Sequence, residues 1–130
     1  MSIAIKQMIK TSLIDWEGKI VSTLYLPGCN FRCPFCYNVE LILHPDHLKN
    51  IPQKEIDNYL LERKDFIDGI CMSGGEPTLY SHLPEYFKGL KEKGFLVKLD
   101  TNGTNPELLK KLLNFNLVDF IALDIKSSLD

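Results

Sequence analysis

Residues 19–36 read KIVSTLYLPGCNFRCPFC, a β-branched and apolar run followed directly by three closely spaced cysteines. The run from Lys19 to Leu26 ends at a Pro-Gly pair, which predicts a buried strand that opens into a loop. In that loop Cys29, Cys33 and Cys36 lie within eight residues. Thiolates clustered this closely usually serve one soft metal centre, so the stretch predicts a strand leading into a metal-binding loop.

Three cysteine ligands favour an iron-sulfur cluster with an open position. A 4Fe-4S cluster held by three cysteines has one iron free to bind a substrate, whereas an electron-transfer cluster normally uses four thiolates. The alternative is a zinc site completed by Cys71 or a histidine. Structural zinc sites favour two short Cys/His pairs separated by a loop, however, whereas the three cysteines here form one cluster within eight residues.

Two further interpretations leave the cysteines without a metal. A disulfide framework needs a secreted chain, and the N-terminal residues MSIAIK lack the apolar core and cleavage site of an export signal. Inert buried thiols suit Cys71, which lies in an apolar run, but they do not suit three cysteines beside Asn30 and Arg32. The metal-binding loop is therefore the favoured interpretation.

The composition predicts one ordinary globular domain over residues 1–130. Hydrophobic residues make up 45% of the chain and charged residues 25%. Fifteen basic and seventeen acidic residues give a net charge of -2, so no electrostatic footprint for nucleic acid or anionic membrane is visible. No stretch approaches the roughly twenty apolar residues needed to span a bilayer. We expect a cytoplasmic protein with no nucleic-acid or membrane partner.

Strand and helix patterns alternate along the rest of the chain. Helices are expected over Gln53 to Phe66, His82 to Lys93 and Pro106 to Leu113, and further strands over Ile67 to Met72, Phe95 to Leu99 and Val118 to Ile125. Strands that alternate with helices pair in parallel through crossover connections. The fold class is therefore α/β with a parallel sheet.

The conspicuous polar motifs fall at or just after strand ends. They are the cysteine loop, Ser73-Gly74-Gly75-Glu76-Pro77, Asp100-Thr101-Asn102-Gly103 and Asp124-Ile125-Lys126. The carboxyl ends of parallel strands share one edge, where ligands bind. Such residues are also common in ordinary turns, and for Asn102-Gly103 alone the turn interpretation would be preferred. As an ordered set behind the cysteine loop, the motifs predict one binding site.

The CxxxCxxC spacing, with Phe35 before the last cysteine and Gly74-Gly75-Glu76-Pro77 about forty residues further on, resembles the radical S-adenosylmethionine (SAM) enzymes. The resemblance implies a partial (β/α) barrel with its helices on the outer face. About four βα units fit in this chain, so it looks like a truncated, N-terminal portion of such a barrel. It also implies a 4Fe-4S cluster and SAM as cofactors, and the reductive cleavage of SAM to methionine and a 5'-deoxyadenosyl radical.

The resemblance assigns roles to single residues. Gly74 and Gly75 let the backbone approach a ligand closely, and Glu76 offers a carboxylate to a cation. In the family this segment binds the amino group of SAM. Phe35 would lie beside the adenine, although a core position is equally compatible with its sequence. Lys126 would contact a carboxylate or ribose oxygen of the cofactor, with a surface lysine as the alternative.

Within the family, the order Asp-Thr-Asn-Gly and then Asp-x-Lys is most similar to the activating enzymes of glycyl radical proteins. The group that activates anaerobic ribonucleoside-triphosphate reductase is particularly similar. By this resemblance Asp100, Thr101 and Asp124 would hold a monovalent cation near SAM, and Asn102 belongs to the same motif. Two departures are Asp15-Trp16-Glu17-Gly18, where Asp-Gly-Pro-Gly is common, and Tyr37, where a histidine is usual.

The resemblance also implies protein partners. These are a glycyl radical enzyme and a low-potential electron donor such as flavodoxin or ferredoxin. Two other functions remain open: a radical SAM enzyme acting on a small molecule or peptide, and a catalytically incompetent metal-binding fragment. Because the expected strand Val118 to Ile125 is apolar on both faces, we also expect self-association through its uncovered edge.

Overall fold

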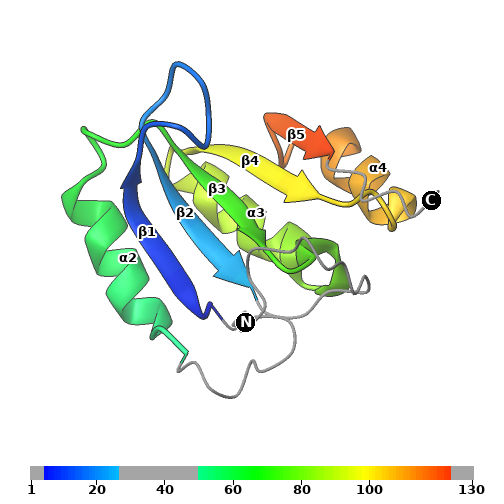
Figure 1. The fold of residues 1–130 in the computed structure, drawn as a ribbon, viewed down its shortest axis with the longest axis horizontal. Coiled ribbons are helices and arrows are strands. Elements are labelled where there is room, and N and C mark those ends of the chain that lie inside the picture. The colour runs from blue at the N-terminus through cyan, green and yellow to red at the C-terminus, as the bar shows by residue number, and fades with distance from the viewer. Residues whose placement is uncertain (1–4, 27–49, 124–130) are drawn as a thin grey trace.

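The computed structural model describes residues 5–26 and 50–123, which contain one five-stranded sheet. Its order is β1-β2-β3-β4-β5 (Figure 1). The strands are β1 (Gln7–Ser12), β2 (Val21–Leu26), β3 (Gly69–Gly74), β4 (Leu96–Thr101) and β5 (Phe120–Leu123). Strands β2 to β5 are parallel, whereas β1 pairs with β2 in the antiparallel sense. The predicted α/β fold with a parallel sheet is confirmed.

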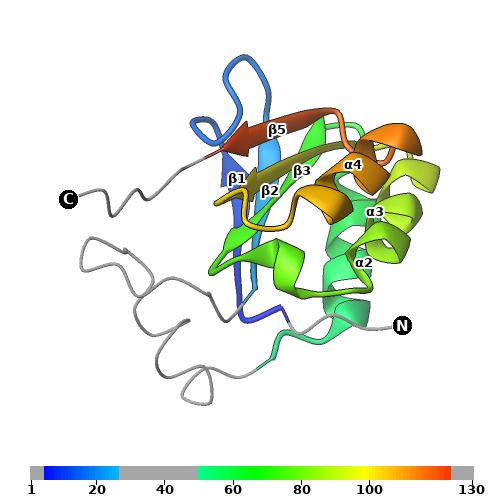
Figure 2. The ribbon, with the colours of Figure 1, turned by 90° about the vertical axis from the view of Figure 1, so that its right-hand side faces the viewer.

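Helices cover one face of the sheet, as Figure 2 shows. They are α2 (Gln53–Glu62), α3 (Leu83–Glu92) and α4 (Pro106–Asn114), and a short 3-10 helix, η2 (Pro77–Leu79), follows β3. Helix α2 begins directly after Pro52 and buries Ile56 and Leu60, as the sequence pattern predicts, but it ends at Glu62 rather than at Phe66. Helix α3 ends before Gly94, whose φ of +92° and N–H bond to Lys91 are those of a helix C-cap.

Strand β1 was not predicted. Its sequence QMIKTS has few apolar residues, and most of its positions are exposed. The strand exists because its backbone continues the sheet: it pairs along β2 in a register that joins Gln7 to Tyr25 and Ile9 to Thr23. An exposed edge strand of this kind needs little hydrophobic patterning, so sequence periodicity gives only a weak signal for it.

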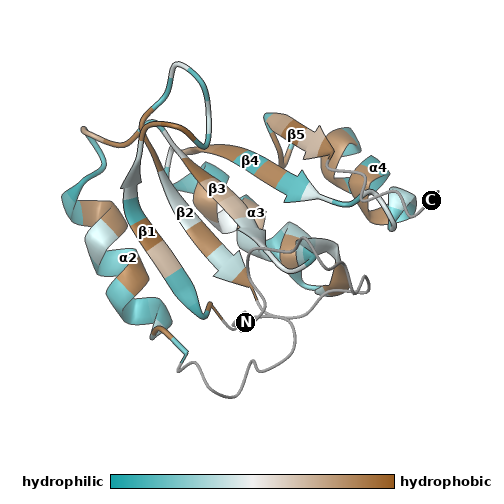
Figure 3. Cartoon of the chain, viewed as in Figure 1, coloured by the Kyte–Doolittle hydropathy of each residue, from teal (hydrophilic) through white to brown (hydrophobic). Residues whose placement is uncertain are grey.

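The hydrophobic core lies between the sheet and the helices. Its fully buried side chains include Leu24, Leu26, Ile70, Met72, Val97 and Leu99 from the strands, and Ile56, Leu60, Leu83, Phe87 and Leu112 from the helices. Brown, hydrophobic stretches run along β3 and β5, and the helices carry both brown and teal bands (Figure 3). Since side chains alternate along a strand, the residues between these core positions face away from the helices.

Strand β5 forms the edge of the described sheet. Phe120 is 49% exposed and Leu123 is 57% exposed. The strand begins two residues later than expected, and the expected end of the strand, Asp124 and Ile125, lies outside the described residues. Among the described residues, none of the helices has the length and apolar character that crossing a membrane requires.

Candidate functional site at the carboxyl ends of the strands

Gly74 packs directly against the end of β2. It pairs with Leu26 in the parallel register and has a φ of +113°. A Cβ at this position would lie 2.3 Å from the Leu26 carbonyl oxygen and 2.4 Å from its nitrogen, so a side chain does not fit. The N–H of Gly75 donates to the same carbonyl oxygen at 2.9 Å. Leu26 is the last described residue before the cysteine segment, so the Gly-Gly pair contacts the strand that leads into the cysteines.

The Glu76 carboxylate joins the ends of β3 and β4. Glu76 is only 1% exposed. Its Oε2 accepts hydrogen bonds from the Thr101 hydroxyl at 2.5 Å, from the Thr78 N–H at 3.1 Å and from the Thr78 hydroxyl. Its Oε1 accepts from the N–H of Asn102 at 2.7 Å. The predicted ligand carboxylate is thus held by four donors of the protein itself.

Two residues that the sequence analysis missed extend this network. Thr78 supplies two of the four donors to Glu76. Asn105 donates from its side chain to the carbonyl oxygen of Thr78 at 3.1 Å and caps helix α4 by accepting from the N–H of Leu108. An asparagine before Pro-Glu is a recognisable N-cap signal, whereas the contact with Thr78 depends on the tertiary structure.

The side chain of Asn102 closes its own turn. Its Oδ1 accepts from the N–H of Thr104 at 3.1 Å and from the Thr104 hydroxyl at 2.7 Å. This is the local hydrogen bonding of an Asx turn. The backbone of Asn102 nevertheless belongs to the site, because its N–H holds Glu76.

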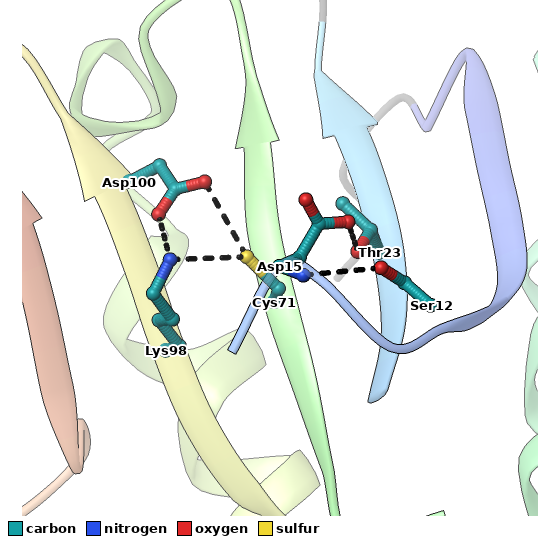
Figure 4. Close-up of polar contacts among 6 residues, drawn as sticks. All are labelled: Ser12, Asp15, Thr23, Cys71, Lys98 and Asp100. Carbon is teal, nitrogen blue, oxygen red and sulfur yellow. Dashed lines mark hydrogen bonds and ion pairs between the residues drawn. The ribbon is translucent and has the colours of Figure 1, made fainter. Parts of the chain in front are cut away.

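A second polar cluster lies on the sheet face opposite the helices (Figure 4). Here the Nζ of Lys98 lies 2.5 Å from Oδ1 of Asp100 and 3.9 Å from Sγ of Cys71. The Cys71 thiol donates to Oδ2 of Asp100 at 3.4 Å. Burial, and then the negative charge of Asp100, raise the pKa of the Cys71 thiol well above its ordinary value. Cys71 therefore stays protonated and is a poor nucleophile and metal ligand.

The connection between β1 and β2 contributes to the same face. The hydroxyl of Thr23 donates to the Asp15 carboxylate at 2.6 Å, and the Trp16 ring stacks on Phe120 with centroids 6.1 Å apart. Burial raises the pKa of Tyr25, and the nearby charges of Asp15 and Asp100 add to the shift. The segment that departs from the common Asp-Gly-Pro-Gly turn thus packs over the strands.

The side chains of Asp100 and Thr101 lie on opposite faces of β4. Asp100 shares its face with Lys98, whereas Thr101 is buried and donates to Glu76 on the other side. One ion cannot be bound by both side chains in this arrangement. The third predicted cation ligand, Asp124, lies outside the described residues.

The remaining predicted site residues also lie outside the described part of the chain. These are the cysteines Cys29, Cys33 and Cys36, together with Phe35 and Lys126. Within residues 5–26 and 50–123, no group of three or more His, Cys, Asp or Glu side chains could hold a metal ion. The metal-ligand prediction therefore depends on the CxxxCxxC segment.

A mostly parallel α/β sheet with polar motifs at the carboxyl ends of its strands is typical of enzymes that bind ligands at that edge. The model of the Radical SAM superfamily matches residues 23–130. The chain belongs to this superfamily.

Several curated relatives are similar to the chain. A protein of Methanocaldococcus jannaschii, named as a candidate glycyl-radical enzyme activating enzyme, is 38% identical over 100% of the chain and 53% of its own length. The pyruvate formate-lyase-activating enzyme of Listeria monocytogenes is 32% identical over 87% of the chain and 49% of its own length. The 7-carboxy-7-deazaguanine synthase of Aquifex aeolicus is 31% identical over 70% of the chain and 42% of its own length. The chain spans about half the length of the curated relatives that it matches.

One solved structure shares the fold. The crystal structure of QueE from Escherichia coli superposes with a TM-score of 0.63 at 19% sequence identity, over 78% of this chain and 53% of that one. The five-stranded sheet therefore resembles part of a radical SAM barrel.

Proposed function

We propose that the chain is part of an enzyme that activates a glycyl radical protein. When bound, a reduced 4Fe-4S cluster would supply the electron for the reductive cleavage of SAM to methionine and a 5'-deoxyadenosyl radical. The overall reaction would remove one hydrogen atom from a glycine of the partner and leave 5'-deoxyadenosine and a glycyl radical. Anaerobic ribonucleoside-triphosphate reductase is the partner we propose, with a flavodoxin or ferredoxin as the electron donor.

The observation that carries the proposal is the contact between Gly74-Gly75 and Leu26 in a chain of the radical SAM superfamily. It fixes a glycine-rich backbone against the strand that precedes three cysteines, the donor set that suits an iron-sulfur cluster. The names of the Methanocaldococcus and Listeria relatives support the activating role.

We assign the following roles to the chain's own residues. Cys29, Cys33 and Cys36 would hold the cluster, and the backbone of Gly74 and Gly75 would receive the amino group of SAM. Glu76 positions that backbone, since its carboxylate is bonded to β4 and to η2. By the family resemblance we assign Phe35 to the adenine, Lys126 to a carboxylate or ribose oxygen of the cofactor, and Asp124 to the same SAM site.

Anaerobic reconstitution with iron and sulfide, followed by electron paramagnetic resonance, tests the proposal. We expect a reduced-cluster spectrum that changes when SAM is added, and 5'-deoxyadenosine among the products. With anaerobic ribonucleoside-triphosphate reductase present, a glycyl radical signal should appear in the partner. The Cys36→Ala variant is the negative control for each step. A reduced-cluster spectrum that is unchanged when SAM is added would instead indicate a catalytically incompetent metal-binding fragment.

A second candidate is a radical SAM enzyme that acts on a small molecule or peptide. The similarity to a 7-carboxy-7-deazaguanine synthase favours it. The two candidates differ in what stimulates 5'-deoxyadenosine formation: the partner protein in the first, and a low-molecular-weight substrate in the second. Stimulation by the partner alone would exclude the second candidate.

A further inference from the structure

We propose that Lys98 supplies from within the chain the positive charge that Asp100 requires, so that no monovalent cation binds at this carboxylate. The inference rests on the proposed function, because it concerns how the same SAM site is built. Its basis is the ion pair on the sheet face opposite the helices (Figure 4).

Both oxygens of Asp100 already have a donor. Oδ1 lies 2.5 Å from the ammonium of Lys98, and Oδ2 accepts the Cys71 thiol at 3.4 Å. Lys98 and Asp100 are two residues apart on β4, so strand geometry places them on one face. The pairing is therefore built into the strand and needs no movement of another element.

Neighbouring strands hold the Lys98 side chain in place. The parallel registers align Lys98 with Cys71 on β3 and with Phe120 on β5. The ammonium lies 3.9 Å from the Cys71 sulfur and 5.9 Å from the centre of the Phe120 ring. Lys98 is only 8% exposed, and an ammonium that is this buried requires a paired negative charge.

A metal cation at Asp100 would have to displace this ammonium or lie beside it. Two positive charges at such short range repel each other strongly in a partly buried site. The hydroxyl of Thr101 cannot serve as a second ligand of that cation, because it lies on the other face of β4, where it donates to Glu76. The side chains thus fit an internal ammonium and do not fit a shared bound ion.

The test compares SAM affinity in KCl, NaCl and choline chloride at equal ionic strength, because choline is too large to replace a bound ion. For the cluster-loaded wild type we expect the same affinity in all three salts. Lys98→Met should lose about tenfold in affinity in choline chloride, the cost of one charge-assisted contact, and should recover it in KCl or NaCl. Lys98→Arg keeps the charge and should remain indifferent to the salt.

Lys91→Met is the matched control, because Lys91 forms a 2.6 Å ion pair with Asp119 away from the site. It should bind SAM like the wild type in every salt. The inference would be overturned if the SAM affinity of the wild type rose when KCl replaced choline chloride. It would also be overturned if the SAM affinity of Lys98→Met were the same in all three salts.

Thermal unfolding of the cluster-free protein gives a readout that does not depend on SAM. We expect Lys98→Met to lower the Tm by about 5 °C in choline chloride, with partial recovery in KCl, whereas Lys91→Met should show no recovery. If the cluster-loaded wild type bound no SAM in any salt, the proposed function would be wrong, but the Tm values would still test whether Lys98 neutralises Asp100. If Lys98→Met did not fold, the dependence of SAM affinity on the salt in the wild type and in Lys98→Arg would test the inference instead.

Discussion

The hydroxyl of Thr101 donates a 2.5 Å hydrogen bond to Oε2 of Glu76, which joins the last residue of β4 to the segment after β3. Twenty-five residues separate the two in sequence. The bond places the Gly-Gly-Glu-Pro and Asp-Thr-Asn-Gly motifs side by side, as expected for carboxyl ends of neighbouring parallel strands. The position of the Gly-Gly backbone therefore depends on a buried carboxylate.

Glu76→Ala should weaken SAM binding and destabilise the fold, but leave the cluster in place. Each buried donor left without its acceptor costs about 1–3 kcal/mol, so we expect a loss of about 3 kcal/mol or more in the free energy of unfolding. SAM affinity should fall about tenfold to hundredfold. Denaturant titration, iron content and SAM titration measure the three effects.

Glu85→Ala is the control for this prediction, because Glu85 is an exposed residue of the first turn of α3. It should change neither SAM affinity nor iron content. Unchanged SAM affinity in Glu76→Ala would remove Glu76 from the site.

Gly74→Ala should be strongly destabilising. The new Cβ would lie 2.3 Å from the Leu26 carbonyl oxygen, and the φ of +113° strains any residue with a side chain. We expect a loss of more than about 2 kcal/mol in the free energy of unfolding. Gly89→Ala is the matched control: nothing lies within 4 Å of its added Cβ, and inside α3 the change should stabilise by about 0.5–1 kcal/mol. Equal effects of the two substitutions would contradict the close approach of Gly74 to β2.

Alanine substitution of Cys29, Cys33 or Cys36 should abolish iron binding, whereas Cys71→Ala should retain it. The reason is that Cys71 is fully buried in β3 and bonded to Asp100, while the other three share one short segment. Iron and sulfide analysis after reconstitution measures the difference. Loss of iron in Cys71→Ala, with retention in Cys36→Ala, would reverse the ligand assignment.

The protonated state of Cys71 predicts how stability depends on pH. Burial and Asp100 raise the pKa of this thiol in the folded state, so the folded protein keeps a proton that the unfolded chain releases above about pH 8.5. The contribution of Cys71 is therefore full below that pH and is lost as the pH rises further.

Unfolding of the cluster-free protein between about pH 7 and 10 should accordingly show a decline in stability that is smaller in Cys71→Ala. Burial raises the pKa of Tyr86 to about 12, so Tyr86 adds a decline only at higher pH. Iodoacetamide at mildly alkaline pH should leave Cys71 unmodified until the protein unfolds, as peptide mass spectrometry would report. Rapid labelling of native Cys71 would contradict its protonated state.

The exposed edge of β5 predicts self-association. Leu123 and Phe120 are about half exposed on a strand with no partner on its outer side among the described residues, and such an edge pairs readily with another chain. Leu123→Lys should shift sedimentation toward the monomer, whereas Leu61→Lys, at an exposed position of α2, should not. A wild-type protein that sediments as a stable monomer and cleaves SAM fully would contradict the prediction that the β5 edge needs a partner strand.

The local sequence determined the order of the elements and the placement of the motifs. Helices α2, α3 and α4 and strands β2 to β5 follow from apolar periodicity, and the motifs at their ends follow from parallel pairing. The sequence does not predict strand β1, because an exposed edge strand forms through backbone hydrogen bonds and its side chains show little hydrophobic pattern.

Only the tertiary structure decided which polar groups meet. In the sequence Glu76 is a free carboxylate, but the packing of β3 beside β4 buries it under donors from Thr78, Thr101 and Asn102. Likewise, strand alternation puts Lys98 and Asp100 on one face, but the register with β3 brings Cys71 to them. The physical reason is that periodicity fixes the face of a residue, whereas its partners depend on strands distant in sequence.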